Sequence, residues 1–366
     1  MRERVRSTRR FAFVGRLAAV AALGLSALVL VIFSTTPSRA GEVALSESGS
    51  TLFYPVFKVW AEDYEKSHSG VKITTAATGS QKGIEDAISG AAQIGASDAY
   101  MSDAESRRYP TIVNVPMAIS AQTVNYNLPG LDGVNLRLDG PTLAAIYGGK
   151  VRTWDDKAIA ALNPTLKLPS NAIVPIRRAE GSGDTFVFTQ YLTFSTPSWE
   201  DSIGFGTTIP WPAVSGEVEA TGNEAMIEKL RETPYSLGYV GVSYHDKIDK
   251  AGLGTAALKS YDGEFLLPTP DSIAAAAAGL GPRTPTDERL TLVNAPGPNA
   301  YPLINYEYAI VSTQQPNAET AAAIRKFLLW ATAPDEANQK YLDQAHFIAL
   351  PAHIWVLSYD QIAKIK

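Results

Sequence analysis

A strand, a glycine-rich turn and a helix start follow one another in the middle of the chain, and this order restricts the fold more than any other stretch. Ala172–Ile176 is a short β-branched run, typical of a buried strand. Apolar residues between Val187 and Leu192 recur at three- and four-residue spacing, which predicts an amphipathic helix. The turn Gly181-Ser182-Gly183 joins the two, so it lies where the first backbone N–H groups of a helix have no partner within that helix.

The residues around this turn fit an anion clamp. Glycines allow the backbone to approach a ligand closely, Ser182 adds a hydroxyl donor, and Arg178 adds a planar fork of donors for an oxyanion. The alternative is a plain helix cap, in which Ser182 or Asp184 caps the helix and the arginines are solvated. This segment alone leaves both interpretations open.

The same pattern occurs twice more near the start of the chain. Ser50 and Thr51 stand between a strand that begins near residue 43 and a helix that reaches residue 66. Thr78-Gly79-Ser80 stands between the strand Val71–Ala77 and a helix over Gln81–Ser89. Three serine-bearing helix starts favour the anion clamp. The next short strand ends at Asp98, which is either a cap for the following helix or a carboxylate placed beside the clamp.

Strands alternate with helices along the chain, which predicts an α/β fold with largely parallel sheets. In such sheets, ligands bind beyond the carboxyl ends of the strands, where the three helix starts lie. With 366 residues the chain is long enough for two domains. We expect the chain to cross into a second domain within 111–128 and to return at 301–312, so that residues 41–125 and 300–366 form one lobe and residues 126–299 form the other.

The first 40 residues read as a secretory signal peptide, in which arginines precede an apolar run over residues 17–33. Small residues at Ser38 and Ala40 predict cleavage after Ala40, and an uncleaved membrane anchor is the alternative. This segment carries seven arginines and one glutamate, so the net charge changes from −5 to −11 when it is removed. An acidic chain is a poor nucleic-acid binder.

Nothing in the sequence argues for catalysis, a metal or a cofactor. Gly181-Ser182-Gly183 lacks the outer glycines of a nucleophile elbow, and no nucleotide-binding glycine motif is complete. The chain has no cysteine, and its four histidines have no metal-ligand spacing and lie outside the clamp segments. We therefore expect a binding protein rather than an enzyme.

Four motifs together resemble the phosphate-binding proteins of phosphate-specific ABC transporters. The resemblance covers nearly all of the chain after residue 42. In chain order the motifs are Gly49-Ser50-Thr51-Leu52, Thr78-Gly79-Ser80, Gly95-Ala96-Ser97-Asp98 and Arg177-Arg178-Ala179-Glu180-Gly181-Ser182-Gly183-Asp184-Thr185-Phe186.

The resemblance implies a two-lobed, type II periplasmic-binding-protein fold, in which each lobe is a mostly parallel sheet flanked by helices and inorganic phosphate lies in the cleft. It further implies that Asp98 accepts a phosphate proton and that Glu180 orients Arg178 through a salt bridge. The implied ligand-binding residues are Ser50, Thr51, Leu52, Ser80, Asp98, Arg178, Ser182, Gly183 and Asp184.

Two positions depart from the family pattern. Many members have threonine where this chain has Asp184, and a carboxylate there can serve only through its backbone N–H or by accepting a second phosphate proton. Many Gram-positive members also carry a lipid-modified cysteine, which is absent here, so a soluble periplasmic protein is favoured, with a secreted or anchored form as the alternative. We expect a monomer.

The expected function is therefore capture of phosphate outside the cytoplasmic membrane and its delivery to an ABC permease with its ATPase. The alternatives are a receptor for another tetrahedral oxyanion, such as sulfate, and a secreted phosphate-ester hydrolase.

Overall fold

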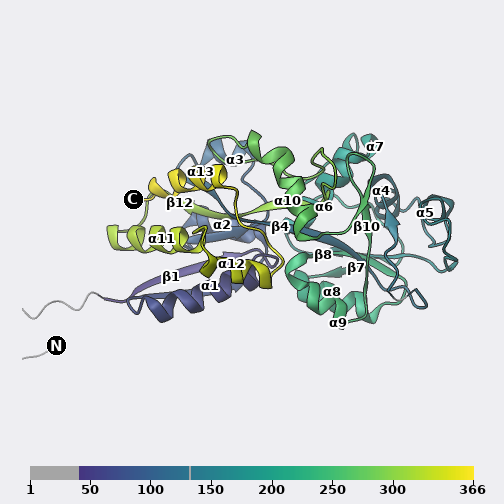
Figure 1. Cartoon of the computed structure of the whole chain (residues 1–366), viewed down its shortest axis with the longest axis horizontal. Coiled ribbons are helices and arrows are strands. Elements are labelled where there is room, and N and C mark those ends of the chain that lie inside the picture. Colours follow the sequence, from purple (N-terminus) through teal and green to yellow (C-terminus); the bar gives the residue numbers. More distant parts are fainter. Residues whose placement is uncertain (1–40, 132) are drawn as a thin grey trace, which may run out of the picture. The chain divides into compact units, whose positions relative to one another are not determined.

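The computed structural model describes residues 41–131 and 133–366, so the predicted signal peptide lies outside the described residues. The first third alternates strands with helices (Figure 1). These elements are β1 (Val43–Gly49), α1 (Tyr54–Ser67), β2 (Val71–Ala77), α2 (Ser80–Ser89), β3 (Ile94–Ser97), α3 (Asp103–Arg108) and the long β4 (Ile112–Tyr126).

The middle of the chain carries shorter strands and the helices between them. In order these are β5 (Arg137–Leu138), α4 (Gly140–Tyr147), α5 (Lys157–Leu162), β6 (Val174–Arg178), α6 (Gly183–Ser195), α7 (Pro197–Glu200), β7 (Val218–Ala220), α8 (Gly222–Glu232), β8 (Ser236–Gly241), η1 (Val242–Tyr244), α9 (His245–Lys250), β9 (Gly254–Thr255), β10 (Ala257–Lys259), β11 (Phe265–Leu266), α10 (Pro270–Leu280) and η2 (Gly281–Arg283). The chain ends with β12 (Ile304–Ser312), α11 (Ala318–Ala331), α12 (Glu336–Gln344) and α13 (Ala352–Ala363).

The main sheet contains two sets of three parallel strands. Its order is β2-β1-β3-β12-β4-β8-β6-β7, with β9 also paired to β4. The outer sets, β2-β1-β3 and β8-β6-β7, are parallel within themselves, as the alternation of strands and helices predicts. The strands between them are antiparallel: β12 runs against β3 and β4, and β4 runs against β8. The sheet therefore differs from the predicted, largely parallel one at its centre, because β12 lies between two strands that run in the opposite direction.

Strand β4 belongs to both halves of this sheet. Its residues from Ile112 to Ala121 pair with β12, and those from Gln122 to Tyr126 pair with β8. Because β1 and β3 run in the same direction as β4, whereas β6 and β8 run against it, the carboxyl ends of the two parallel sets point towards each other. Helix starts that follow these ends are thereby brought together.

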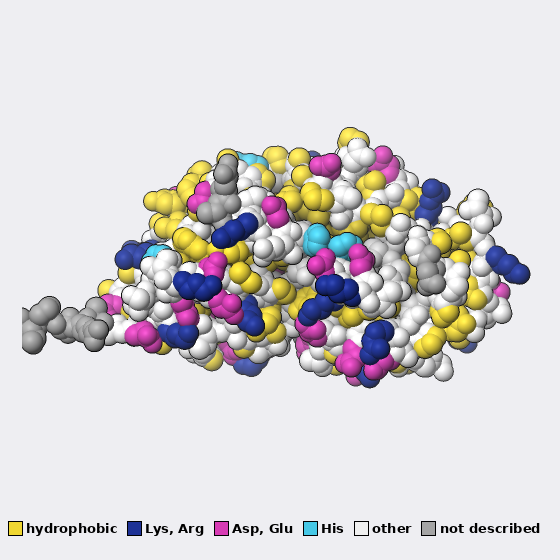
Figure 2. All heavy atoms as spheres, turned by 60° about the horizontal axis from the view of Figure 1, so that its bottom comes forward, with side chains coloured by type: hydrophobic (Ala, Val, Ile, Leu, Met, Phe, Trp, Pro, Cys, Tyr) yellow, Lys and Arg dark blue, Asp and Glu magenta, His cyan; other side chains and the backbone are white. Residues whose placement is uncertain are grey.

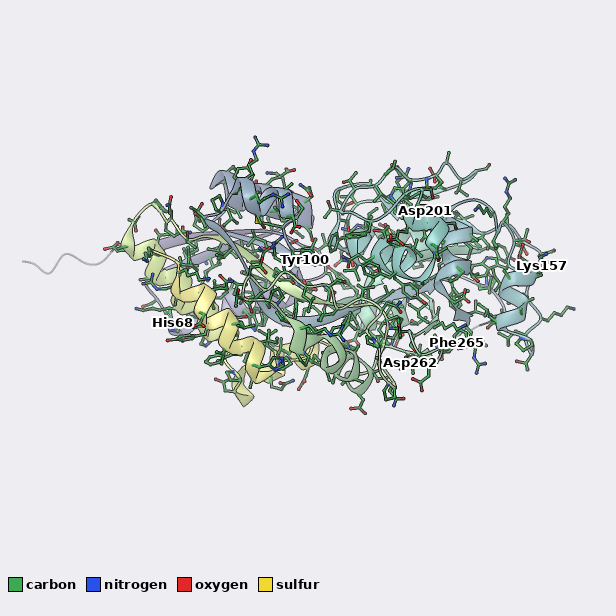
Figure 3. The ribbon with its side chains drawn as sticks, turned by 90° about the horizontal axis from the view of Figure 1, so that it is seen from above. His68, Tyr100, Lys157, Asp201, Asp262 and Phe265 are labelled. Carbon is green, nitrogen blue, oxygen red and sulfur yellow. The ribbon has the colours of Figure 1, made fainter. Side chains whose placement is uncertain are left out.

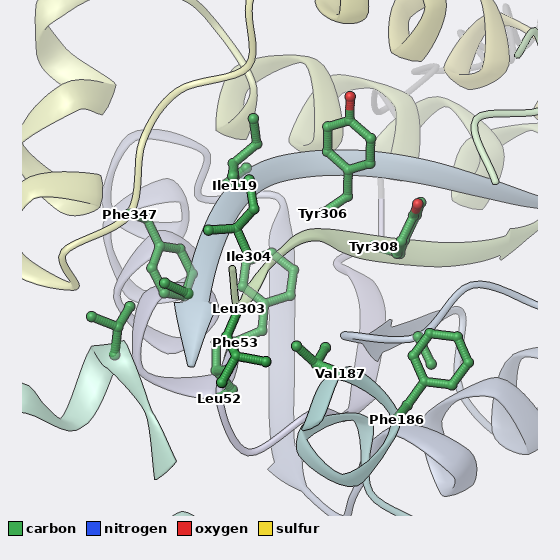
Figure 4. Close-up of a cluster of buried hydrophobic side chains, with 14 of the residues drawn as sticks. Leu52, Phe53, Ile119, Phe186, Val187, Leu303, Ile304, Tyr306, Tyr308 and Phe347 are labelled. Carbon is green, nitrogen blue, oxygen red and sulfur yellow. The ribbon is translucent and has the colours of Figure 1, made fainter. Parts of the chain in front are cut away.

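The apolar face predicted for the helix after residue 53 is confirmed in α1. Pro55 occupies its first turn, where the missing N–H costs little, and Phe57, Trp60 and Tyr64 are buried. Phe53 contacts Phe57 and Trp60 edge to face, with ring centroids 5.5 and 5.6 Å apart. Figure 4 shows Phe53 in a cluster of buried side chains that also includes Val187 at the start of α6. The helices that begin near the candidate site are thus anchored in one core.

Within residues 41–131 and 133–366, no helix combines the length and the apolar character needed to cross a membrane.

Candidate ligand-binding site

The turn after β1 is built by a close approach between two backbones. The N–H of Ser50 donates to the carbonyl oxygen of Ala96 at the end of β3, at 2.9 Å. Gly49 has φ = +145°, and a Cβ on this residue would lie 1.9 Å from the same carbonyl oxygen. Only glycine fits there, and its presence sets Ser50 against the end of β3.

Two serines from different segments converge on the Asp98 carboxylate. Ser50 Oγ donates to Asp98 Oδ1 in a short hydrogen bond, and Ser80 Oγ donates to Oδ2 at 3.3 Å. Ser80, the first residue of α2, also accepts from the N–H of Asp98 at 3.2 Å. Asp98 is 2% exposed and does not cap the next helix, because the hydroxyl of Ser102 performs that role for α3. Asp98 is therefore a carboxylate bound by two serines and not the cap of the following helix.

The guanidinium of Arg178 is buried, and all three of its nitrogens have partners. Nε donates to Glu180 Oε1 at 2.8 Å, and Nη2 makes a short hydrogen bond to the same oxygen. Nη2 also donates to Thr51 Oγ1 at 3.1 Å, and Nη1 forms a short ion pair with Asp184. The Glu180 salt bridge implied by the resemblance is present. Arg178 is therefore not a solvated surface arginine.

Asp184 is held by donors from three elements. Its Oδ2 accepts from Asn223 Nδ2 at 2.8 Å as well as from Arg178, and its Oδ1 accepts from Gln122 Nε2 at 2.9 Å. Asn223 also donates to Thr51 Oγ1 at 2.8 Å. In this structure the side chain of Asp184 is the counter-charge of Arg178. Gln122 and Asn223 are not among the residues predicted from the sequence, although Gln122 stands out as a long polar side chain within the buried run of β4.

The start of α6 packs directly against Asp98. A Cβ on Gly183 would lie 2.3 Å from Asp98 Oδ2 and 2.4 Å from Ser80 Oγ, so this position also requires glycine. Ser182 caps the helix, since its Oγ accepts from the N–H of Thr185 at 3.3 Å. Its own N–H donates to the carbonyl oxygen of Thr207 at 2.9 Å. The cap interpretation is thus correct for Ser182 and wrong for Arg178, which is buried and fully paired.

Leu52 contributes only its backbone to this region. Its N–H donates to Ser50 Oγ at 3.1 Å, and its side chain is fully buried in the core. Figure 4 shows that side chain beside Phe53.

Burial and neighbouring charges shift the pKa values of the site. Burial first, and then the charge of Asp184, raise the pKa of Asp98 to about 6. For Arg178, burial opposes the charged form, but Asp184 and Glu180 outweigh it and raise the pKa above its ordinary value. Burial raises the pKa of Tyr239 to about 12, and its hydroxyl hydrogen-bonds Thr185 at 2.7 Å. At neutral pH the site therefore contains an ionised Asp98, a charged Arg178 and a neutral tyrosine.

The histidines do not belong to this cluster. His68 stacks on Tyr64 at the end of α1, with ring centroids 3.8 Å apart, and Figure 3 shows it well away from Tyr100, two residues after Asp98. His245 and His346 contact each other elsewhere, with ring centroids 4.9 Å apart. Across the described ranges, no group of three or more His, Asp or Glu side chains is arranged to hold a metal ion. On the face drawn in Figure 2, lysines and arginines alternate with acidic side chains rather than forming one basic field.

Comparison with known proteins places these features in a family. Residues 34–335 match the family model described as the PBP superfamily domain. The phosphate-binding protein PstS of Xylella fastidiosa (strain Temecula1) is 32% identical over 326 residues, covering 88% of this chain and 86% of that protein.

Two solved structures share the fold. The high-affinity periplasmic phosphate-binding protein PfluDING, solved with bound phosphate, superposes with a TM-score of 0.69 at 17% identity, covering 88% of this chain and 93% of that one. A phosphate-binding protein from Stenotrophomonas maltophilia gives a TM-score of 0.64 at 20% identity, covering 87% and 94%.

Proposed function

Because the chain belongs to the PBP superfamily and, within it, to the family of PstS phosphate-binding proteins, we propose that it captures inorganic phosphate and delivers it to an ABC permease for import. The observation that carries this proposal is the assembly of one buried cluster from four separate segments. Ser50, Ser80, Asp98 and Arg178 come from the ends of three strands and the start of a helix. Hydroxyl donors, a guanidinium and helix N-termini are the groups that bind oxyanions.

The proposed phosphate ligands are those that the resemblance implies. Hydroxyls and backbone N–H groups donate to the phosphate oxygens, Arg178 supplies the charge-assisted donors, and Asp98 accepts a phosphate proton. The N–H groups of Leu52 and Ser182 exchange their present intramolecular hydrogen bonds for the ligand. The full set is Ser50, Thr51, Leu52, Ser80, Asp98, Arg178, Ser182, Gly183 and Asp184, with Glu180 orienting the arginine.

Asp98 gives the proposed site its selectivity. Phosphate near pH 7 keeps at least one proton, whereas sulfate keeps none. A buried carboxylate accepts a hydrogen bond from the first and faces only lone pairs on the second, which is costly. Since burial raises the pKa of Asp98 to about 6, the accepting, ionised form predominates above that pH.

Several further properties follow from the same proposal. The segment before Gly41 directs export and is removed after Ala40, which leaves a monomeric, non-catalytic protein outside the cytoplasmic membrane. The permease and its ATPase are its partners in the membrane. The lobes are residues 41–125 with 300–366, and residues 126–299, and the crossings between them lie near the end of β4 and just before β12.

Titration calorimetry on the purified chain beginning at Gly41 tests the proposal. Phosphate should bind in a 1:1 ratio, sulfate should compete poorly, and a chromogenic phosphate ester should be neither bound tightly nor hydrolysed. Equal binding of sulfate would indicate a general oxyanion receptor, and release of the chromophore would indicate the hydrolase.

A further inference from the structure

A second buried carboxyl group, that of Glu307, lies behind Asp98 and has no role in the proposed site. Glu307 is in the middle of β12 and has no exposed surface. Its Oε1 accepts a short hydrogen bond from Ser120 on β4 and another from Asn305 Nδ2 at 3.1 Å. Asn305 also donates to the carbonyl oxygen of Asp98 at 3.3 Å, which ties β12 to the end of β3.

The other oxygen of Glu307 shows how the two carboxyl groups interact. Among the described residues, Oε2 is buried and has no donor that would satisfy a carboxylate oxygen there. Glu307 and Asp98 are neighbours across the sheet, because Tyr308 on β12 pairs with Ser97 on β3 in an antiparallel register and Asn305 Nδ2 hydrogen-bonds both Glu307 Oε1 and the carbonyl oxygen of Asp98. Two carboxylates cannot form a hydrogen bond to each other, so a hydrogen bond between these side chains requires a proton. A protonated Oε2 that donates to Asp98 gives both atoms a partner.

The charges around the pair favour this arrangement. Arg178 is the cation that acts on Asp98, and it already pairs with Glu180 and Asp184. A second ionised carboxylate at Glu307 would then be buried beside the negative charge of Asp98, which is unfavourable. Other polar groups that face the pair, namely Ser50, Ser80, Ser120 and Asn305, are neutral.

We propose that Glu307 is a positioning residue that keeps its proton at neutral pH, donates it in a hydrogen bond to Asp98, and so holds Asp98 ionised and aimed to accept the proton of phosphate. This inference rests on the proposed function. The pair carries one negative charge, and that charge resides on Asp98, where a protonated oxyanion can use it. Glu307 adds no second charge that would repel the ligand.

The pKa directions agree with this geometry. Burial, followed by the charge and the hydrogen bond of Asp98, raises the pKa of Glu307 well above its ordinary value. The pKa of Asp98 reaches about 6, and the Glu307 and Ser50 hydrogen bonds lower it against the effect of burial. Phosphate binding should therefore weaken below about pH 6 as Asp98 gains a proton, and weaken again at alkaline pH as Glu307 loses its own.

The variants Glu307→Gln and Glu307→Leu separate positioning from mere packing. Glutamine keeps a neutral acceptor for Ser120 and a donor for Asp98, so phosphate affinity at pH 7 should stay within about threefold while the alkaline weakening disappears. Leucine removes one hydrogen-bond partner from each of Ser120, Asn305 and Asp98, so affinity should fall about tenfold or more and the acidic limb should move to higher pH. If Glu307 were ionised, glutamine would remove a negative charge and tighten phosphate binding by about tenfold or more, which would overturn the inference.

Infrared difference spectroscopy detects the proton on Glu307 in the absence of phosphate. At pH 7, wild type minus Glu307→Gln should show the C=O stretch of a neutral carboxylic acid. Glu288→Gln is the matched control, because burial raises the pKa of Glu288 to about 8 and its neighbours are Ser358, Lys364, Asp287 and Asp360. That variant should lose a comparable band and bind phosphate as wild type does.

The two failures are distinguishable. If Glu288→Gln loses a carboxylic-acid band and Glu307→Gln does not, the inference is wrong while the proposed function still stands. This result does not depend on whether Glu307→Leu folds. Absence of phosphate binding by wild type overturns the proposed function, and with it the positioning role, whatever the infrared bands show.

Discussion

Glu47 makes the stability of this protein depend on pH, and its replacement by glutamine should remove much of that dependence. The residue lies on β1 with 2% of its surface exposed, and burial raises the pKa of its carboxyl from 4.5 to about 8. The native state therefore keeps a proton that the unfolded chain gives up between these two values. Because the pKa is raised on folding, the stabilising contribution is complete below about pH 4.5 and is lost as the pH rises through about 8.

The magnitude follows from the width of this interval. Each unit of pKa difference corresponds to about 1.4 kcal/mol. A pH of 7 is about 2.5 units above the pKa of the carboxyl in the unfolded chain, whereas the carboxyl in the native protein is still protonated at that pH. Wild type should therefore lose about 3 kcal/mol of unfolding free energy between pH 4 and pH 7 through Glu47. Glutamine has no proton to lose, so the same interval should cost Glu47→Gln about 3 kcal/mol less.

Urea unfolding at half-unit pH steps from 4 to 8 measures this difference. Glu42→Gln is the matched control, because Glu42 is exposed near the start of the same strand and its replacement should change stability by at most about 0.5 kcal/mol. If Glu47→Gln and wild type lose stability in parallel across the whole range, Glu47 does not carry the raised pKa and the reasoning is wrong.

Four further predictions concern the site and the N-terminus. Arg178→Ala should weaken phosphate binding by about 2–5 kcal/mol in calorimetry. Arg177→Ala should not weaken it, because Arg177 pairs with Glu217 and Glu219 instead. Equal effects of the two variants would contradict the role of Arg178 in the clamp. Asp98→Asn should narrow the discrimination of phosphate from sulfate in competition binding across pH 5–8, because an amide can donate to a fully ionised anion; unchanged discrimination would contradict its proposed role. Gly183→Ala should lower the melting temperature and cost about 1–3 kcal/mol, since its Cβ would lie 2.3 Å from a carboxylate oxygen, and a wild-type melt would disprove that crowding. N-terminal sequencing of exported protein should begin at Gly41, and membrane-bound protein that begins at Met1 would favour the anchor.

Local patterns predicted most of the elements, because each pattern is complete within a few residues. The strand Val71–Ala77 has the predicted bounds, and the helix predicted over Gln81–Ser89 begins one residue earlier, at Ser80. In β6 the strand continues through Arg178, because Arg177 and Arg178 pair with β7.

The order of the strands could not be predicted in the same way. Periodicity reports which face of a strand is buried, not which strand lies beside it. The insertion of β12 between β3 and β4 depends on contacts between residues about 200 positions apart, as the Asn305–Asp98 hydrogen bond shows with its separation of 207. No local signal in the chain encodes such a neighbour.

The charged residues of the candidate site could be predicted from the sequence, whereas the residues that hydrogen-bond them could not. Serines at helix starts, Asp98 and Arg178 stand out because their side chains are polar at strand ends. Gln122 and Asn223 hold Asp184 from a different strand and a different helix, and each resembles an ordinary polar residue in the sequence. Their importance arises only when folding brings them to a shared carboxylate.

The place of β12 in the sheet has a consequence for how the chain folds while it is being made. Synthesis delivers β1, β3 and β4 within the first 126 residues, but the strand that pairs with both β3 and β4 begins only at Ile304. Until then, β3 lacks one neighbour and β4 lacks its partner along Ile112–Ala121. Such distant pairing slows folding, because a long loop must close before the contacts form. A growing chain of this topology stays incompletely folded for most of its synthesis, and that is the state which the proposed export through a narrow secretion channel requires.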